Sequence, residues 1–346
     1  MSEDRRGGVT VMTGILSVIV VYSHVVSEAV TEYAKDSFQF LFVFTTQHFS
    51  RVAVPCFIFL SAFKYFAKYS EKPVGFSYPR FALGRVRRVY LPYLLWVLIF
   101  YVYFVYAARY FPFDAADLAR YAVTGDISAQ LYFVVIIMQF YLLMPFWRAV
   151  ALGRKGWGWA AAFMAVSAAV TYAARLVFAR VPYIDRIFAA YLLFWAAGMV
   201  CGVNHQRFFG ILARRRAAVW IAFALVTAAH LGLTYANARG FFVYTASEAV
   251  HTAYGLFAAF FLLDLGVFLW PRLGAAAPAA SLVSDSSYYV FLAHTLPIRI
   301  ASAAAPEGLG ITARMAIQGA FAYVSSFGLA ALYVLAKRRL VNRRKG

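Results

Sequence analysis

Long apolar runs separated by short polar breaks are the main feature of this chain. The runs cover residues 9–27, 41–63, 89–108, 131–147, 157–178, 187–203, 217–236, 246–269, 288–304 and 310–336. Each approaches the ~20 residues with which an α-helix crosses a ~30 Å hydrocarbon layer. The pattern therefore predicts an all-α, polytopic transmembrane helix bundle of about ten spans. It also predicts one integral-membrane domain covering residues 1–346.

Two of the prolines inside these runs are expected to disturb their helices. Pro55, in the second run, removes a backbone donor and leaves an earlier carbonyl unpaired. Such broken helices are tolerated in membranes where they line a cavity. Pro297 is expected to kink the ninth span, which is short.

The composition supports a membrane protein and argues against two other classes. Hydrophobic residue types make up 63% of the chain and charged types 14%, whereas a soluble domain has roughly 45–50% and 25%. The net charge of +19 would suggest nucleic acid in a soluble protein. Basic residues beside membrane spans are instead topology determinants, so no nucleic-acid partner is expected. Cys56 and Cys201, both in apolar runs, form no disulfide framework or metal motif.

The distribution of basic residues predicts the orientation of the spans. With a cytoplasmic N-terminus, the inner segments hold 23 of the 33 lysines and arginines and the outer segments hold 6. Cytoplasmic loops carry such an excess of positive charge. Both termini are therefore predicted to be cytoplasmic, in a multi-pass protein of the plasma membrane that contacts membrane lipids.

Several ionisable residues lie inside the predicted spans and are candidates for chemistry. Charged groups at membrane depth are costly, and they usually face a cavity or one another. The residues in question are Arg51, Arg175, Arg299, Arg314, Glu248, Asp264, His24, His48, His230, His251 and His294. A passive anchor or scaffold would have little reason to carry them.

His24, at the outer part of the first run, is a candidate general base. The ordinary pKa of histidine, about 6.5, suits proton transfer near neutral pH. Thr13 and Ser17 are expected close to the same face of the helix. The alternative is a packed or hydrogen-bonded structural histidine, and the same alternative applies to His294 in the ninth run.

Glu248 and His251 form a second candidate pair, in the eighth run. They are three residues apart and therefore share one face of an α-helix. They fit an acid–base or orienting couple, and equally a buried structural hydrogen bond.

Three arginines are candidates for binding an anion. Arg51 presents a fork of donors suited to a carboxylate or phosphate, or else an ion pair with a residue such as Glu248. Arg85 and Arg88, at the predicted cytoplasmic edge of the third span, are three apart and share a face in an α-helix. Their guanidinium groups could grip a phosphorylated donor such as coenzyme A. The alternative is a positive anchor against lipid headgroups.

Taken together and in order, the motifs resemble those of the membrane acyltransferase-3 family of bacterial sugar O-acyltransferases. The similarity is greatest to the branch of the intercellular-adhesion polysaccharide acyltransferases of Gram-positive bacteria. The motifs are His24, Arg51…Val54-Pro55…Phe59-Leu60-Ser61, Arg85-x-x-Arg88…Pro92, Leu131-Tyr132-Phe133…Gln139-Phe140-Tyr141-Leu142-Leu143-Met144-Pro145 and Ser287-Tyr288…His294. The resemblance implies a ten-helix bundle. It also implies an acyl-CoA donor, with acetyl-CoA expected, and an acceptor hydroxyl on a cell-surface glycan or its lipid-linked precursor.

The resemblance also implies roles for individual residues. His24 matches the catalytic histidine, while Arg85 and Arg88 match the arginine pair linked to the donor. Arg51 and Ser61, in the second-span motif, are expected to help bind the acyl-CoA donor. Glu248 or His251 is expected to orient His24 or the acceptor, and no metal is implied. Direct transfer and a covalent acyl-histidine intermediate both stay open.

Two positions depart from the family pattern. Many members have arginine eleven residues before the histidine, where this chain has Thr13, so Arg5, Arg6 or Arg51 would have to substitute. Many have Ser-Gly where this chain has Ser61-Ala62. A non-enzymatic transporter or flippase for a glycan precursor is the alternative function, because it shares buried charges and broken helices. The sequence is compatible with a homo-oligomer and with membership of a polysaccharide-synthesis complex.

Overall fold

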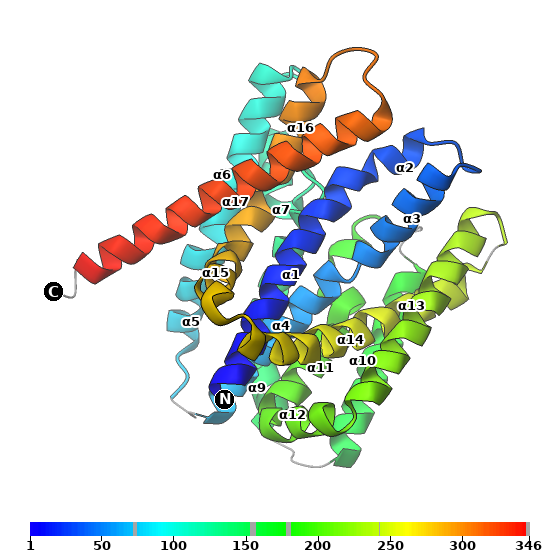
Figure 1. Cartoon of the computed structure of the whole chain (residues 1–346). Helices are drawn as coiled ribbons and strands as arrows, with labels where there is room; N and C mark the ends of the chain where they lie inside the picture. The colour runs from blue at the N-terminus through cyan, green and yellow to red at the C-terminus, as the bar shows by residue number, and fades with distance from the viewer. Residues whose placement is uncertain (72–74, 153–156, 178–180, 242, 344–346) are drawn as a thin grey trace. The chain divides into compact units, whose positions relative to one another are not determined.

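The computed structural model describes residues 1–71, 75–152, 157–177, 181–241 and 243–343, and within these ranges it contains helices and no β-strand (Figure 1). Seven helices are long and apolar enough to cross a membrane, or up to nine if each of two bent helix pairs counts as one span. The all-α, multi-span class is therefore confirmed. The count of ten spans and the cytoplasmic termini stay predictions.

The chain divides into two compact units. The first comprises residues 1–53, 215–235 and 257–346, and the second comprises residues 54–214 and 236–256. Two helices, α13 (Arg216–Ala238) and α14 (Tyr244–Leu269), pass from one unit to the other.

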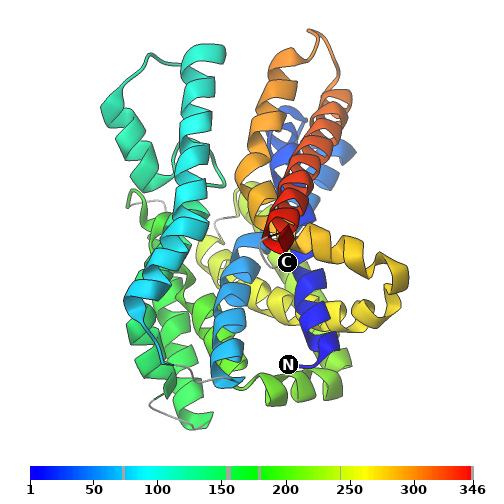
Figure 2. The same ribbon diagram turned by 90° about the vertical axis from the view of Figure 1, so that its left-hand side faces the viewer.

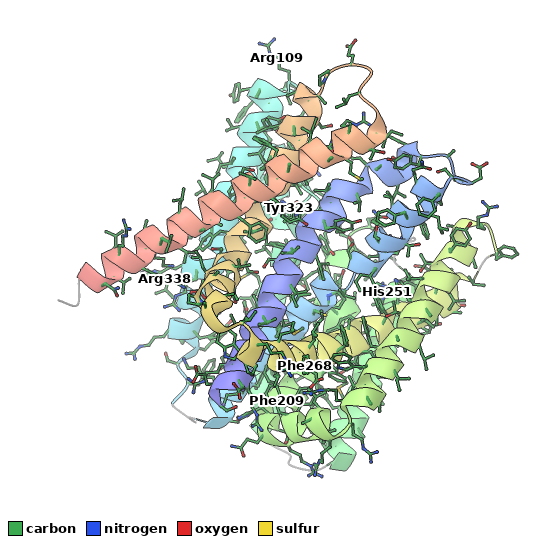
Figure 3. All side chains as sticks on the ribbon, in the orientation of Figure 1. Arg109, Phe209, His251, Phe268, Tyr323 and Arg338 are labelled. Atoms are coloured by element: carbon green, nitrogen blue, oxygen red, sulfur yellow. The ribbon has the colours of Figure 1, made fainter. Side chains whose placement is uncertain are left out.

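The first unit is built around α1, which runs from Glu3 to Ser27. The other helices of this unit are α2 (Ala29–Glu32), α3 (Phe38–Ser50), α15 (Ala277–Ala293), α16 (Thr295–Ala304) and α17 (Ile311–Arg343). Helix α1 packs against α3, α15, α16 and α17, and Figure 2 shows α16 and α17 side by side. Tyr323, labelled in Figure 3, donates a hydrogen bond of 2.9 Å from α17 to the Val18 carbonyl of α1.

A close contact between backbones joins α1 to α14 within this unit. A Cβ atom added to Gly266 would lie 2.3 Å from the carbonyl oxygen of Gly8. Only glycine permits helix axes to approach so closely, which is a common device between membrane helices.

The second unit contains the remaining helices. They are α4 (Ala53–Glu71), α5 (Tyr78–Arg85), η1 (Val86–Tyr90), α6 (Leu91–Val102), η2 (Tyr103–Ala107), α7 (Ala115–Thr124), α8 (Tyr132–Leu142), α9 (Met144–Leu152), α10 (Trp157–Leu176), η3 (Ile184–Arg186), η4 (Phe188–Tyr191), α11 (Leu192–Val203) and α12 (His205–Arg214). Two further short helices, η5 (Trp270–Arg272) and η6 (Gly274–Ala276), belong to the first unit. The core of the second unit is aromatic, since Phe140 stacks on Trp195 with ring centroids 4.5 Å apart. Gly198 of α11 lies against α4, where an added Cβ would be 2.2 Å from the Phe59 carbonyl oxygen.

Two of the helix breaks in the apolar runs lie four residues before a proline. A proline cannot donate to the carbonyl four residues earlier, and for Pro297 that carbonyl belongs to Ala293, the last residue of α15. For Pro55 it belongs to Arg51, which follows the end of α3. The expected break before Pro55 is confirmed, since α3 ends at Ser50 and α4 begins at Ala53. At Pro297 the structure shows a helix boundary between Ala293 and Thr295, and the kink stays a prediction. This boundary places His294 between α15 and α16.

Candidate functional site

Two histidines from distant parts of the chain meet in the first unit. His24 lies in the last turn of α1, and His294 lies at the junction of α15 and α16. Their ring centroids are 5.0 Å apart, and the ring planes are inclined by 50°. Two titratable rings thus lie in contact beside an apolar helix.

The hydrogen bond of His294 defines which of its nitrogens is available. Nδ1 lies 3.1 Å from the carbonyl oxygen of Val290. A carbonyl only accepts, so Nδ1 carries the hydrogen and the neutral ring has its lone pair on Nε2. His294 is fully buried, and its Nε2 has no hydrogen-bond partner among the described residues. A buried acceptor without a partner costs roughly 1–3 kcal/mol, which a purely structural residue would gain nothing by retaining.

His24 is more accessible than its neighbour. Its residue is half-buried, and its ring forms no hydrogen bond with the described part of the chain, although its backbone carbonyl accepts one of 2.8 Å from Ser27. The pair therefore combines one ring that a reactant can approach with a second ring, behind it, that holds an unused lone pair.

A charged pair lies one helical turn beyond the histidines. Arg299 Nη1 is 3.0 Å from Glu28 Oε1, and Gln318 Nε2 is 3.4 Å from the other oxygen of Glu28. Arg299, predicted inside the ninth span, thus pairs with a carboxylate just beyond the end of the first predicted span.

Thr13 and Ser17 precede His24 in α1, and their hydroxyl groups form hydrogen bonds within that helix. Thr13 donates 2.7 Å to the Val9 carbonyl, and Ser17 donates 2.8 Å to the Thr13 carbonyl. Both are buried. Such back-bonding is usual for hydroxyls in membrane helices, so neither residue has a clear chemical task.

Glu248 of α14 is held by an arginine in the second unit. Arg175 Nε lies 2.7 Å from Glu248 Oε2, and the two side chains are 9% and 18% exposed. The ion pair considered for Arg51 with Glu248 is thus formed by Arg175. His251, labelled in Figure 3, is buried on the same helix as Glu248.

Arg85 and Arg88 lie in different surroundings. Arg85 ends α5, is half-buried, and places its guanidinium 5.0 Å from the Phe81 ring centroid and 5.1 Å from that of Tyr141. Arg88 is exposed within η1, a π-helix. A π-helix has more residues per turn than an α-helix, so the α-helical spacing that predicted a shared face does not apply there. Such π segments are frequent at functional sites.

The second-span residues have local contacts. Arg51 is exposed and follows the last turn of α3, in the first unit. Ser61 donates 2.8 Å to the Phe57 carbonyl, in the second. Across the described ranges, no group of three or more His, Cys, Asp or Glu side chains gathers that could hold a metal ion.

His294 is the residue whose importance the sequence understated. Its ring looked as compatible with packing as with chemistry, and its contact with His24 joins positions 270 residues apart. The available signal was the Ser287-Tyr288…His294 motif followed by Pro297, which together place the histidine at a helix break.

Comparison with known proteins gives one match. A family model described as an acyltransferase domain matches residues 6–336, a range that includes both histidines of the pair and Glu248, His251, Arg85 and Arg88. Neither the curated proteins nor the solved structures contain a match to the chain.

Proposed function

The chain belongs to the acyltransferase family whose domain model matches residues 6–336, and from this premise we propose that it is an acyl-CoA-dependent O-acyltransferase of the plasma membrane. The donor is cytoplasmic acyl-CoA, with acetyl as the acyl group. The acceptor is a hydroxyl of a cell-surface glycan or its lipid-linked precursor, as in the intercellular-adhesion branch.

The contact between His24 and His294 carries this proposal. In the reaction, His24 removes the proton from the acceptor hydroxyl while the oxygen attacks the thioester carbonyl. The new C–O bond replaces the C–S bond, and His24 returns the proton to the departing thiolate. General-base assistance of this kind contributes about 10²–10⁴-fold in rate. His294 supports the step by accepting a hydrogen bond, from His24 or from the acceptor, at its unpartnered Nε2.

Donor binding is assigned to the arginines of the inner edge. Arg85 and Arg88 are proposed to bind the phosphates of coenzyme A, because guanidinium forks match phosphate oxygens. The aromatic rings against Arg85 fix its guanidinium without neutralising its charge. Arg51 and Ser61 are assigned to donor handling from the family motif alone.

Glu248 and His251 belong to the second unit, whereas His24 belongs to the first, so the expectation that they orient His24 or the acceptor stays a prediction. Because Arg175 occupies the Glu248 carboxylate, this pair is less suited to proton transfer than the two histidines.

Replacement of His24 tests the proposed function. His24→Ala and His24→Gln should abolish acylation of the surface glycan while protein amount and acyl-CoA binding stay near normal. Glutamine can form hydrogen bonds but cannot accept a proton in this pH range. Ser17→Ala, on the same helix, is the matched control and should retain activity. Activity restored by glutamine would assign His24 an orienting role in place of a basic one.

A further inference from the structure

A polar cluster continues from the histidine pair along the same helices. It consists of Glu28, Arg299 and Gln318, whose contacts with one another were described above. Glu28 lies four residues after His24, and therefore on the same side of the chain's α-helical path. Arg299 lies five residues after His294. In the topology predicted from the basic residues, this cluster lies on the outer side of the histidine pair.

The helical register brings this cluster next to the histidines. The separation in sequence is 270 residues for His24 and His294 and 271 for Glu28 and Arg299. Because the two separations are nearly equal, the α1 chain and the α15–α16 chain run in the same direction past each other. The charged pair therefore follows the histidine pair by about one helical turn, ~5.4 Å along the axis.

Arg299 and Glu28 are accessible and have hydrogen-bonding capacity to spare, whereas Gln318 is buried behind Glu28. The side chain of Arg299 is 51% exposed and that of Glu28 is 31% exposed. Arg299 donates one hydrogen bond within the described structure, to Glu28, although a guanidinium has five N–H donors. Glu28 accepts one bond at each oxygen, although a carboxylate offers about four acceptor positions.

The charge of the cluster indicates the kind of ligand. One carboxylate and one guanidinium cancel, and Gln318 is neutral, although the whole chain has a net charge of +19. An anionic ligand would meet the Glu28 carboxylate. A neutral ligand with many hydroxyl groups can donate to Glu28 and accept from Arg299 at the same time, while the buried Gln318 holds the Glu28 carboxylate in place.

We propose that Glu28, Arg299 and Gln318 form the subsite that binds the acceptor, and that the acceptor is a neutral polyhydroxylated glycan. The proposal rests on the acyltransferase function and assigns it the acceptor side. Glu28 and Arg299 hold the sugar through neighbouring hydroxyls, so that the reacting hydroxyl faces His24. The competing explanation is an ion pair that only ties α1 to α16.

A charge exchange separates these two explanations. In the double variant E28R/R299E the ion pair can re-form, but donors and acceptors trade places around the ligand. The matched control is E32R/R314E, because Glu32 and Arg314 also form an ion pair, one turn farther along. Membranes carrying each variant are supplied with acyl-labelled acetyl-CoA and increasing amounts of the host's solubilised surface glycan. Label in the glycan and label released as free acetate are both counted.

The E28R/R299E variant should need about 10- to 100-fold more glycan for half-maximal transfer, the effect of losing one charge-assisted hydrogen bond. Release of free acetate and the half-saturating acetyl-CoA concentration should not change. The E32R/R314E control should behave as the wild type. If E28R/R299E transfers label at the wild-type glycan requirement, the cluster is only a structural tie and the proposal is wrong. If the wild type itself labels no glycan, the proposed acyltransferase function fails instead.

Discussion

Replacing His294 with leucine should separate stability from activity. The wild-type ring keeps a buried Nε2 without a partner among the described residues, at a cost of roughly 1–3 kcal/mol. Leucine removes that atom and has a similar size. The Val290 carbonyl keeps one donor in the variant, because it also accepts a hydrogen bond of 3.1 Å from the backbone N–H of residue 294.

The expected gain follows from these two contributions. Leucine abolishes the desolvation cost and also the bond from Nδ1 to Val290, which contributes about 0.5–1.5 kcal/mol. The difference lies between roughly −0.5 and 2.5 kcal/mol, mostly in favour of the variant. His294→Leu should therefore unfold in detergent at the wild-type temperature or a few degrees higher, since about 1 kcal/mol corresponds to a shift of a few degrees. Acyl transfer should fall by about 10²–10⁴-fold if the lone pair takes part in proton transfer.

The assay is thermal unfolding of the purified protein, paired with acyl transfer in membranes. His294→Gln completes the set, because it restores an acceptor but cannot be protonated near neutral pH. A destabilised His294→Leu protein would refute the reasoning about the orphan nitrogen. A stable and fully active one would show that His294 takes no part in the reaction.

Three further predictions concern packing and donor binding. Asp264→Ala should destabilise the protein by about 1–3 kcal/mol, because the buried carboxylate accepts hydrogen bonds from Arg216 at 2.8 Å and Trp220 at 2.9 Å, while the 38% exposed Arg216 side chain can be solvated afterwards. The unfolding free energy should show this loss, and a change below about 1 kcal/mol would mean that the pair behaves as an exposed one. Gly198→Ala should lower the unfolding free energy by about 1–3 kcal/mol, since its Cβ would lie 2.2 Å from a backbone oxygen; an unchanged melting temperature would contradict the close approach. Changing Arg85 and Arg88 to glutamine should weaken acyl-CoA binding by several kcal/mol in total, at ~1.5–3 kcal/mol for each charge-assisted bond, as titration of the purified protein would measure. Unchanged binding would return both residues to a lipid-anchoring role.

The fold class was predictable because it depends on local properties. Run length and hydropathy determine which segments form membrane helices, and the backbone rule for proline located the breaks near Pro55 and Pro297. The helices of the ninth run nevertheless differ from expectation, because α15 begins at Ala277, whereas the predicted run begins at residue 288. Hydropathy cannot reveal that a moderately apolar segment continues a helix.

Contacts between distant segments were not predictable from a single sequence. Periodicity identifies the face of a helix but does not name its neighbour, so His24 and His294 could be suspected separately and not as a pair. The same reason explains why Arg51 was considered as a partner for Glu248, whereas Arg175 forms that pair. For Arg85 and Arg88, the shared face predicted from α-helical spacing does not hold because η1 is a π-helix. Nothing in the residue types of this segment indicates a π-helix.

The central claim is that His24 removes the proton from the acceptor hydroxyl, and one measurement tests it directly. Purified protein in lipid vesicles is given acetyl-CoA and the host's solubilised surface glycan, and released coenzyme A thiol is counted against acetyl groups gained by the glycan. The wild type should produce the two in equal amounts, and His24→Gln should produce neither above background while still binding acetyl-CoA. Equal production of both by the variant would contradict the account.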